Sequence, residues 1–515
     1  MYNSTENNKR IAKNTIFLYI RMIAMMVVSL YTFRELLKML GIDNYGTYNV
    51  IGGFVILFSF LSTALTQSNQ RNLSYSLGKG DSTDIQHTFS MIINIQIILG
   101  IIIFISLETV GLWFINYKMN FTPENMSSVN IVYQFSIITF IIQIFQIPFT
   151  STIISHERMA IFSYLSIGEA LLKLCVVLSL NLFQNNRLVI YPILLTINSL
   201  IIFSIYVIFC TRKFPDCHYK PIWIKQKFKE LVSFSGWNML GGLGSVGANQ
   251  GINILINIFY GVSVNASIGI ANQVSAATTS LVGNMQTAFN PQIIKSYATN
   301  NISYFYSLIF RESRFSFYLI SMIGFPIIIC SDTILHLWLN QVPDYAIKFT
   351  QFTIGCCMID VLSGPLWIAN QAIGKVKQYM IVISFITLLN IPLSYILLAH
   401  SFSPVFIFII KIFINVILLG YRILYLKHTI QFPINIYTKE VLVRIIIFSS
   451  GCILIISLLS NLFANNILQQ LLLFITCLFL IIILGLNIML TKRERFFIKT
   501  KVLNIVKHIW LSKRI

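Results

Sequence analysis

The length, composition and charge of the chain are those of a membrane protein. The sequence has 515 residues, of which 56% are hydrophobic and 10% charged, and its mean hydropathy is +0.76. Soluble proteins are about 25% charged. The apolar runs are long enough for membrane helices, which need roughly 20 residues, and they lack the alternation of barrel strands. We therefore expect an integral membrane protein, with no room between the runs for a soluble catalytic domain.

The distribution of basic residues predicts the orientation. The 37 Lys and Arg exceed the 17 Asp and Glu and give a net charge of +20, which in a soluble protein would point to nucleic acid. If the N-terminus is cytoplasmic and each run crosses once, the outside loops hold few basic residues, namely Arg34, Lys38, Lys118, Arg187 and Lys348. Cytoplasmic loops are rich in Lys and Arg. We expect a multi-pass protein of the bacterial cytoplasmic (inner) membrane, with both termini cytoplasmic and no nucleic-acid partner.

The sequence lacks common catalytic and metal-binding motifs. It contains no Walker loop, no GxSxG and no HExxH, so nothing indicates ATP hydrolysis, a serine hydrolase or a metalloprotease. The eight cysteines have no zinc-type spacing and imply no disulfide framework. The sequence predicts no enzyme, no metal and no cofactor. A transporter driven by an ion gradient or by removal of its product needs none of these groups.

The apolar runs predict about 14 membrane helices, since each is long enough to cross a bilayer. The predicted spans are 14–36, 47–70, 88–115, 129–153, 160–182, 188–210, 231–259, 264–290, 304–330, 346–371, 377–399, 402–426, 440–462 and 467–490. A basic loop follows the sixth span. The predicted domains are a six-helix lobe at 1–210, a cytoplasmic linker at 211–230, a second six-helix lobe at 231–430, two further helices at 431–490 and a basic tail at 491–515.

A weak internal repeat supports the two lobes. A shift of 220 residues places Gly41 on Gly261, and each glycine lies at the predicted turn between the first two helices of its half. A duplicated lobe would produce such a period. Repeats with an even number of helices are related by an axis along the membrane normal, with a substrate pathway at their interface. The predicted fold is an all-α polytopic membrane protein with two lobes related by a pseudo-two-fold axis.

Charges inside the spans of the first half are candidate site residues, because a charge at mid-bilayer is costly and must face protein or water. Arg21 lies inside the first span, and Glu35 falls on the same helical stripe nearer the outside. In the fifth span, Glu169 and Lys173 have the favourable i,i+4 spacing. This pair either forms part of a pathway or is a structural ion pair that neutralises itself.

The second half contains a similar set. Lys411 lies near the middle of span twelve with no acidic residue one turn away, which favours a wet cavity or an anionic ligand. Asp360 in span ten either binds a coupling cation or pairs with Lys411 from a neighbouring helix. The glycine-rich span seven is either a gating helix or a tight packing seam.

Amide side chains also recur within the spans. Their number in spans two, seven and eight fits a large hydrated cavity better than a dry bundle. The amides that we expect to contact a polar substrate are Gln67, Gln70, Asn249, Gln250 and Asn253.

Several fragments carry a resemblance to a known family. They are LYIRM at 18–22, YTFR at 31–34, LGIDNYG at 40–46, YNVIGG at 48–53, QR at 70–71, LGKGD at 77–81, IP at 147–148 and HERM at 156–159. The sequence resembles the polysaccharide-transporter family of O-antigen flippases, especially those of Bacteroides-like bacteria, within the multidrug/oligosaccharidyl-lipid/polysaccharide exporter superfamily. The resemblance implies two six-helix lobes around a central cavity, with two extra C-terminal helices, and export of a polyprenyl-diphosphate-linked oligosaccharide for lipopolysaccharide or capsule synthesis.

The resemblance also implies roles for the charges. Arg21 is the first candidate for holding the diphosphate, with Lys173 and Lys411 after it, and the amides would bind sugar hydroxyls. The expected partners are the lipid-linked oligosaccharide, membrane lipids and polysaccharide polymerase or assembly proteins, with the chain working as a monomer. The alternatives are a cation-coupled multidrug exporter, a peptidoglycan lipid-precursor flippase and an oligosaccharide polymerase or ligase. The last would need a larger outside loop.

Overall fold

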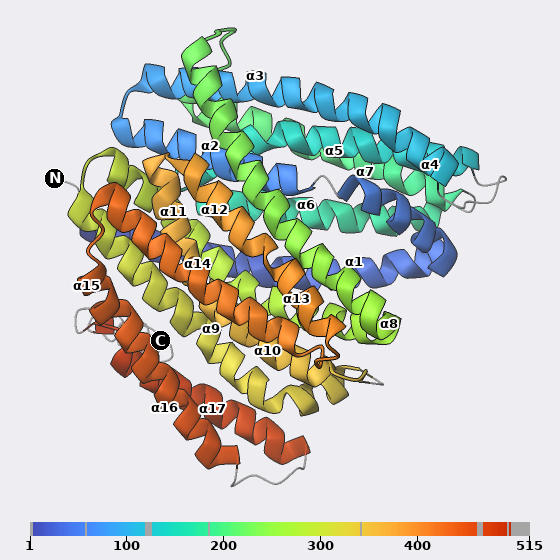
Figure 1. Cartoon of the computed structure of the whole chain (residues 1–515). Helices are drawn as coiled ribbons and strands as arrows, with labels where there is room; N and C mark the ends of the chain where they lie inside the picture. Colours follow the sequence, from blue (N-terminus) through green and yellow to red (C-terminus); the bar gives the residue numbers. More distant parts are fainter. Residues whose placement is uncertain are drawn as a thin grey trace, which may run out of the picture. The chain divides into compact units, whose positions relative to one another are not determined.

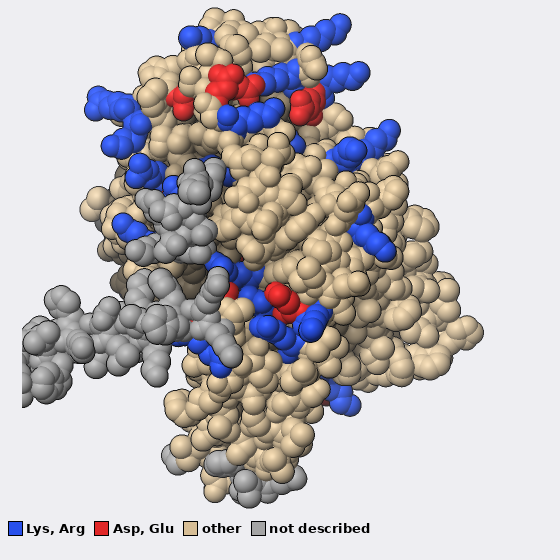
Figure 2. Space-filling view, turned by 90° about the vertical axis from the view of Figure 1, so that its left-hand side faces the viewer, with Lys and Arg blue, Asp and Glu red and all other residues tan. Residues whose placement is uncertain are grey.

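The computed structural model describes residues 4–56, 59–118, 126–183, 186–339, 342–460, 467–491 and 494–495. All regular elements in these ranges are helices (Figure 1), so the predicted all-α fold is confirmed. Eleven helical segments of the described ranges are long and apolar enough to cross a membrane. Figure 2 shows one face of the molecule, on which broad areas without charged side chains separate groups of Lys and Arg, as a bilayer requires.

Contacts divide the chain into two units. Unit 1 comprises Met1–Val246, Thr287–Phe305 and Asn370–Phe385, and unit 2 comprises Gly247–Gln286, Tyr306–Ala369 and Ile386–Ile515. Unit 1 therefore includes two short segments from the second half of the chain. The predicted boundaries at residues 210, 230 and 430 follow chain order rather than contacts, and they stay a prediction. Of the predicted basic tail, all but Thr491, Glu494 and Arg495 lies outside the described residues.

Unit 1 is built mainly from the helices of the first half. These are α1 (Ser4–Ile56), α2 (Ser59–Lys79), α3 (Ser82–Ser106), η1 (Leu107–Gly111), α4 (Leu112–Lys118), α5 (Met126–Ser155), α6 (Met159–Ser179), η3 (Leu180–Leu182), α7 (Arg187–Lys213) and η4 (Pro215–Cys217). Helix α5 packs against α2, α3 and α7, and α1 packs against α6. The Asp81 side chain accepts from the Thr83 amide at 2.9 Å, which caps α3 as an N-terminal carboxylate does.

The second half supplies the helices of unit 2. They are α8 (Lys225–Ala298), α9 (Ile302–Trp338), α10 (Ala346–Asp360), α11 (Ser363–Ile373), α12 (Val376–Leu388), α13 (Asn390–Ala399), α14 (Phe406–Ile430), α15 (Ile434–Tyr437), η5 (Thr438–Leu442), α16 (Val443–Ser460) and α17 (Ile467–Ile488). The two ends of α8, the start of α9, the end of α11 and most of α12 belong to unit 1. Within unit 2, α14 packs against α10 and α13, and α16 packs against α17.

Two boundary predictions were wrong. The expected turns at Gly41 and Gly261 lie inside α1 and α8, because glycine alone does not end a membrane helix, where its neighbours can satisfy the backbone. The predicted spans 231–259 and 264–290 both fall within α8. The predicted span 346–371 agrees with the candidate membrane segment Ala346–Ile373, within which a short break separates α10 from α11.

Candidate functional site

Arg21 of α1 lies in a polar cluster of unit 1. Its guanidinium carbon lies 4.5 Å from the centroid of the Phe162 ring on α6, a cation–π contact that also fixes the side chain. The Tyr206 hydroxyl on α7 interacts electrostatically with both Arg21 and Glu169. Arg21 and Glu169 are half-buried. Three helices thus bring a cation, a carboxyl group and a phenol together within the membrane-spanning part of unit 1.

Lys173 adds a second cation at the edge of this cluster. It lies one helical turn after Glu169 and interacts electrostatically with it, and its own side chain is exposed. The predicted i,i+4 relationship is therefore present. We call the group Arg21, Phe162, Glu169, Lys173 and Tyr206 the Arg21 cluster.

The other predicted site residues of unit 1, which are Glu35, Gln67 and Gln70, lie outside the Arg21 cluster. Glu35 is 14 residues after Arg21 on α1, which is about 21 Å along a helix. Gln70 of α2 is buried, and its backbone carbonyl accepts from the Ser155 hydroxyl of α5 at 3.2 Å. Gln67 is half-buried one turn earlier. Gln67 and Gln70 stay predictions as sugar contacts.

In unit 2, Lys411 lies beside a predicted amide. Its Nζ donates to Asn249 Oδ1 of α8 at 3.4 Å, and Asn253 Nδ2 donates to Gln250 Oε1 at 3.3 Å. One predicted cation and three predicted amides therefore gather on α8 and α14. The sequence placed the three amides in span seven and Lys411 in span twelve, and the hydrogen bond from Lys411 to Asn249 connects the two helices.

Asp360 lies at the end of α10 on a cavity. The cavity has a volume of about 270 Å³ and is lined by Thr279, Val282, Gly283, Gln286, Cys357, Asp360, Val361, Ser363, Gly364, Trp367 and Arg422. Asp360 and Lys411, which we considered as a pair, both interact electrostatically with Cys356. The cation that shares the cavity lining with Asp360 is Arg422 of α14. We call this space the α10–α11 cavity.

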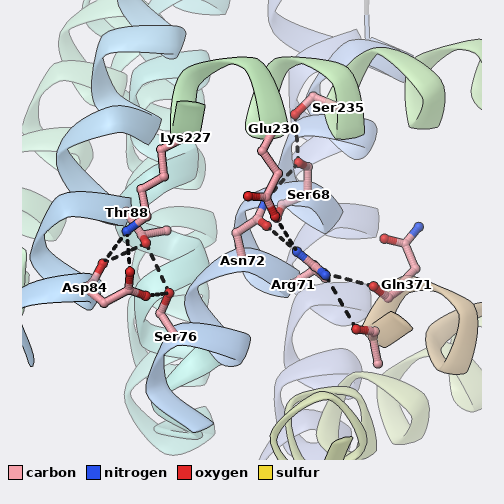
Figure 3. Close-up of polar contacts among 11 residues, drawn as sticks. Ser68, Arg71, Asn72, Ser76, Asp84, Thr88, Lys227, Glu230, Ser235 and Gln371 are labelled. Atoms are coloured by element: carbon pink, nitrogen blue, oxygen red, sulfur yellow. Dashed lines mark hydrogen bonds and ion pairs between the residues drawn. The ribbon is translucent and has the colours of Figure 1, made fainter. Parts of the chain in front are cut away.

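A buried arginine to which the sequence analysis assigned no role joins distant segments of unit 1 (Figure 3). Arg71 Nε donates to the backbone carbonyl of Gln371 at 2.9 Å, and Nη2 donates to that of Ala372 at 3.5 Å. Nη1 donates to Asn72 Oδ1 at 2.7 Å and lies 3.9 Å from Glu230. Because the last carbonyls of a helix carry partial negative charge, Arg71 is a C-terminal cap for α11.

A second buried cluster surrounds Glu157, whose side chain is fully buried. One carboxylate oxygen accepts from Arg10 Nε at 2.7 Å and from Gln292, and the other accepts from Lys295 Nζ at 2.7 Å. The Asn14 side chain donates to the Glu157 carbonyl at 3.1 Å. The cluster ties α1 and the α5–α6 turn to the end of α8 within unit 1.

A third contact fixes the start of α8. Lys227 Nζ donates to Asp84 Oδ1 at 2.7 Å, and the Ser76 hydroxyl donates to Asp84 Oδ2 at 2.7 Å (Figure 3). Ser76 and Thr88 lie 3.1 Å apart through their hydroxyl oxygens. In the predicted orientation, this contact and the Arg71 and Glu157 clusters all lie at cytoplasmic helix ends. Sequence reasoning missed them because their charges fall just outside the spans, where a charge needs no explanation.

The charged clusters do not form a metal site of the usual kind. The described part of the chain contains no group of three or more His, Cys, Asp or Glu side chains that could hold a metal ion. The Arg21 cluster and the α10–α11 cavity present side-chain charges, an amide, hydroxyls and aromatic rings. Such groups can bind and release a polar ligand without covalent chemistry.

Comparisons with known proteins identify the architecture. No protein-family profile and no curated protein matches the chain. Solved structures do match: a MATE mutant aligns with a TM-score of 0.70 at 14% identity, over 82% of this chain and 97% of that one. The chain has the fold of the MATE transporters. The predicted twelve-helix, two-lobe core agrees with that fold.

Other MATE structures match over similar lengths. An outward-facing multidrug resistance MATE family transporter of the MOP superfamily aligns with a TM-score of 0.67 at 14% identity, over 81% of this chain and 95% of that one. A mutant of the Vibrio cholerae MATE transporter VcmN aligns with a TM-score of 0.69 at 14% identity, over 85% of this chain and all of that one. At such identities the likeness concerns the fold, and the substrate must be argued from the side chains.

Proposed function

We propose that the chain is a flippase that moves a polyprenyl-diphosphate-linked oligosaccharide, an O-antigen or capsule repeat unit, from the cytoplasmic to the periplasmic leaflet of the inner membrane. The observation that carries the proposal is the Arg21 cluster. A guanidinium held against Phe162 within a membrane-spanning helix is costly unless it faces protein, water or an anion. A diphosphate is such an anion, and arginine binds phosphate oxygens with two parallel hydrogen bonds.

The remaining groups support the same substrate. Lys173 adds positive charge one helical turn after Glu169, whose carboxylate offsets part of that charge. In unit 2, Lys411 and Arg422 supply further positive charge. Amides and hydroxyls of both units would bind sugar hydroxyls through hydrogen bonds. Translocation would follow from alternating access of the two lobes, as in transporters built from repeats.

A second candidate function is cation-coupled multidrug export. The fold is shared with a structure described as a multidrug resistance MATE transporter, and Asp360 would serve as the coupling carboxylate on the α10–α11 cavity. Cationic drugs favour acidic sites, whereas the clusters here contain more cations than carboxylates. The charge balance favours the flippase, and it equally allows a peptidoglycan lipid precursor, which carries the same diphosphate.

The experiment is to measure polyprenyl-diphosphate-linked saccharide in cells that lack the gene. We expect the lipid-linked saccharide to accumulate on the cytoplasmic leaflet and to return to normal when the gene is restored. The Arg21→Ala variant should not restore it at normal membrane abundance. Lys13→Ala is the matched control, because Lys13 lies two turns earlier on α1 with an exposed side chain.

Two results would count against the proposal. Normal clearance of the lipid-linked saccharide by Arg21→Ala would remove Arg21 from the diphosphate site. No accumulation in the deletion strain, together with increased sensitivity to cationic drugs that the Asp360→Asn variant fails to correct, would favour the multidrug exporter.

A further inference from the structure

The α10–α11 cavity lies where a membrane helix is broken. The apolar segment Ala346–Ile373 is long enough to cross the bilayer, yet α10 ends at Asp360 and α11 begins at Ser363. Both of these residues line the cavity. Interrupted helices inside membranes are tolerated where they are buried in protein or line a cavity, and in transporters such breaks mark ligand sites.

The backbone at this break is held by a glutamine. Gln286 Nε2 donates to the Val361 carbonyl at 3.3 Å and to the Ser316 hydroxyl at 3.2 Å. A Cβ atom on Gly364 would lie 2.5 Å from that same Nε2, which is far closer than van der Waals contact. Glycine at 364 is therefore needed for the Gln286 amide to reach the Val361 carbonyl at the helix break. A specific contact thus fixes this part of the cavity wall.

The lining combines groups of opposite hydrogen-bonding character. Asp360 supplies acceptors only, Arg422 supplies donors only, and the Thr279 and Ser363 hydroxyls can do both. Trp367 supplies a large aromatic surface with one N–H donor. A cationic drug would gain from Asp360 and lose from Arg422, and a phosphate would do the reverse. An uncharged ring with several hydroxyls uses both, because each hydroxyl donates and accepts.

We propose that the α10–α11 cavity binds one sugar ring of the transported saccharide, with the ring against Trp367 and its hydroxyls bonded to Asp360 and Arg422. This inference rests on the proposed flippase function and assigns a sugar site that is separate from the diphosphate site at Arg21. The volume of about 270 Å³ lies just below the roughly 300–1,000 Å³ of ligand pockets. It fits one small ring of a longer saccharide.

The test is equilibrium binding of radiolabelled methyl glycosides to the purified full-length protein in detergent, with methyl glucoside, methyl galactoside and methyl N-acetylglucosaminide as probes. We expect saturable binding of at least one glycoside. Asp360→Asn replaces a charged acceptor and should weaken that binding about tenfold, and Trp367→Leu should weaken it by a similar factor. Asp332→Asn is the control, because Asp332 is exposed, lies on α9 of the same unit and does not line the cavity.

Labelling of Cys357 reports where the glycoside binds, since Cys357 is one of the residues that line the cavity. In a variant with the other seven cysteines replaced by alanine, the bound glycoside should slow labelling of Cys357 by a small thiol reagent. Unchanged thermal midpoints would show that each variant is folded.

Three results would overturn the proposal. They are an absence of glycoside binding across the panel, equal binding by Asp360→Asn and the unsubstituted protein, and protection of Cys357 by tetraphenylphosphonium but by no glycoside. The lipid-linked saccharide is measured in cells with the same variants. Normal clearance with no glycoside site would refute the sugar site alone, whereas an absence of accumulation in the deletion strain would refute the flippase function.

Discussion

Arg71 Nε donates to the backbone carbonyl of Gln371 at 2.9 Å, joining two residues that are 300 positions apart in the chain. The bond places the end of α11, from the second half, against α2 from the first half, within unit 1. In the predicted orientation it lies at the cytoplasmic side. Any conformation in which α2 and the α11–α12 turn separate must break this bond, so Arg71 is expected to hold these two elements of unit 1 together.

Arg71→Ala should destabilise the protein. The variant removes hydrogen bonds from a buried charged donor, and a bond to a charged group contributes about 1.5–3 kcal/mol. We expect a lower thermal midpoint in detergent. Lys79→Ala is the control, since Lys79 lies two turns later on α2, has an exposed side chain and contacts the Tyr75 ring and the charge of Asp84 rather than α11. Equal midpoints for the two variants would contradict the capping role.

Gly374→Ala should be more damaging than Gly80→Ala. Both glycines have left-handed backbones, with φ of +85° and +78°, so alanine at either position costs about 1–3 kcal/mol of backbone strain. A Cβ atom on Gly374 would also lie 2.5 Å from Arg71 Nη2, whereas nothing lies within 4 Å at Gly80. The difference between the two thermal midpoints isolates the contact with Arg71. A larger loss for Gly80→Ala would show that this contact is unimportant.

Glu157→Gln should be strongly destabilising. The change leaves the buried Lys295 ammonium without its carboxylate, and removal of one partner of a buried ion pair costs about 3–5 kcal/mol. The double variant Glu157→Gln/Lys295→Met should recover part of the loss, because it also removes the uncompensated charge. Thermal midpoints measure both, with Glu230→Gln as the control at a side chain that is 66% exposed. A double variant as unstable as the sum of its single changes would argue against direct coupling.

We predict that the buried His156 makes the folded protein less stable in acid. Its ring packs on Phe214 with centroids 4.2 Å apart, and burial lowers the pKa of His156 below its usual value of about 6.5. The folded protein therefore binds the proton more weakly than the unfolded chain does. The stabilisation is complete above about pH 6.5 and declines as the pH falls through the lowered folded-state pKa. His156→Phe should reduce the difference between thermal midpoints at pH 7.5 and pH 5.5, and an unchanged difference would refute the assignment.

The sequence predicted the membrane helices and some of the polar contacts for clear physical reasons. A long apolar run indicates a bilayer crossing. A charge within such a run must face protein or water, so Arg21, Glu169 and Lys411 could be chosen as candidate site residues from the sequence. Asn415, one turn after Lys411 on α14, donates to the Cys356 carbonyl of α10 at 3.4 Å.

Other features could not be predicted because they depend on contacts between distant segments. Arg71 and Glu157 lie at helix ends, where a charge is ordinary, and only their partners show that they are buried. The break between Asp360 and Ser363 lies within an apolar run, so hydropathy passes over it. The signal in the sequence is Pro365, which follows the break and lacks the N–H that would bond the Val361 carbonyl in a continuous helix. The sequence placed Trp367 inside an apolar span with nothing to mark it as a ligand contact. Its position on the cavity wall depends on the break between α10 and α11.

The most direct test of the proposed function uses purified protein in lipid vesicles that contain a fluorescent polyprenyl-diphosphate saccharide, with an impermeant quencher that reports the leaflet. We predict that the protein moves the lipid between leaflets, that Arg21→Ala slows this movement by a factor of ten or so, as loss of one charged hydrogen bond would, and that Lys13→Ala does not. Equal rates for Arg21→Ala and the unsubstituted protein, or no movement above protein-free vesicles, would contradict the account.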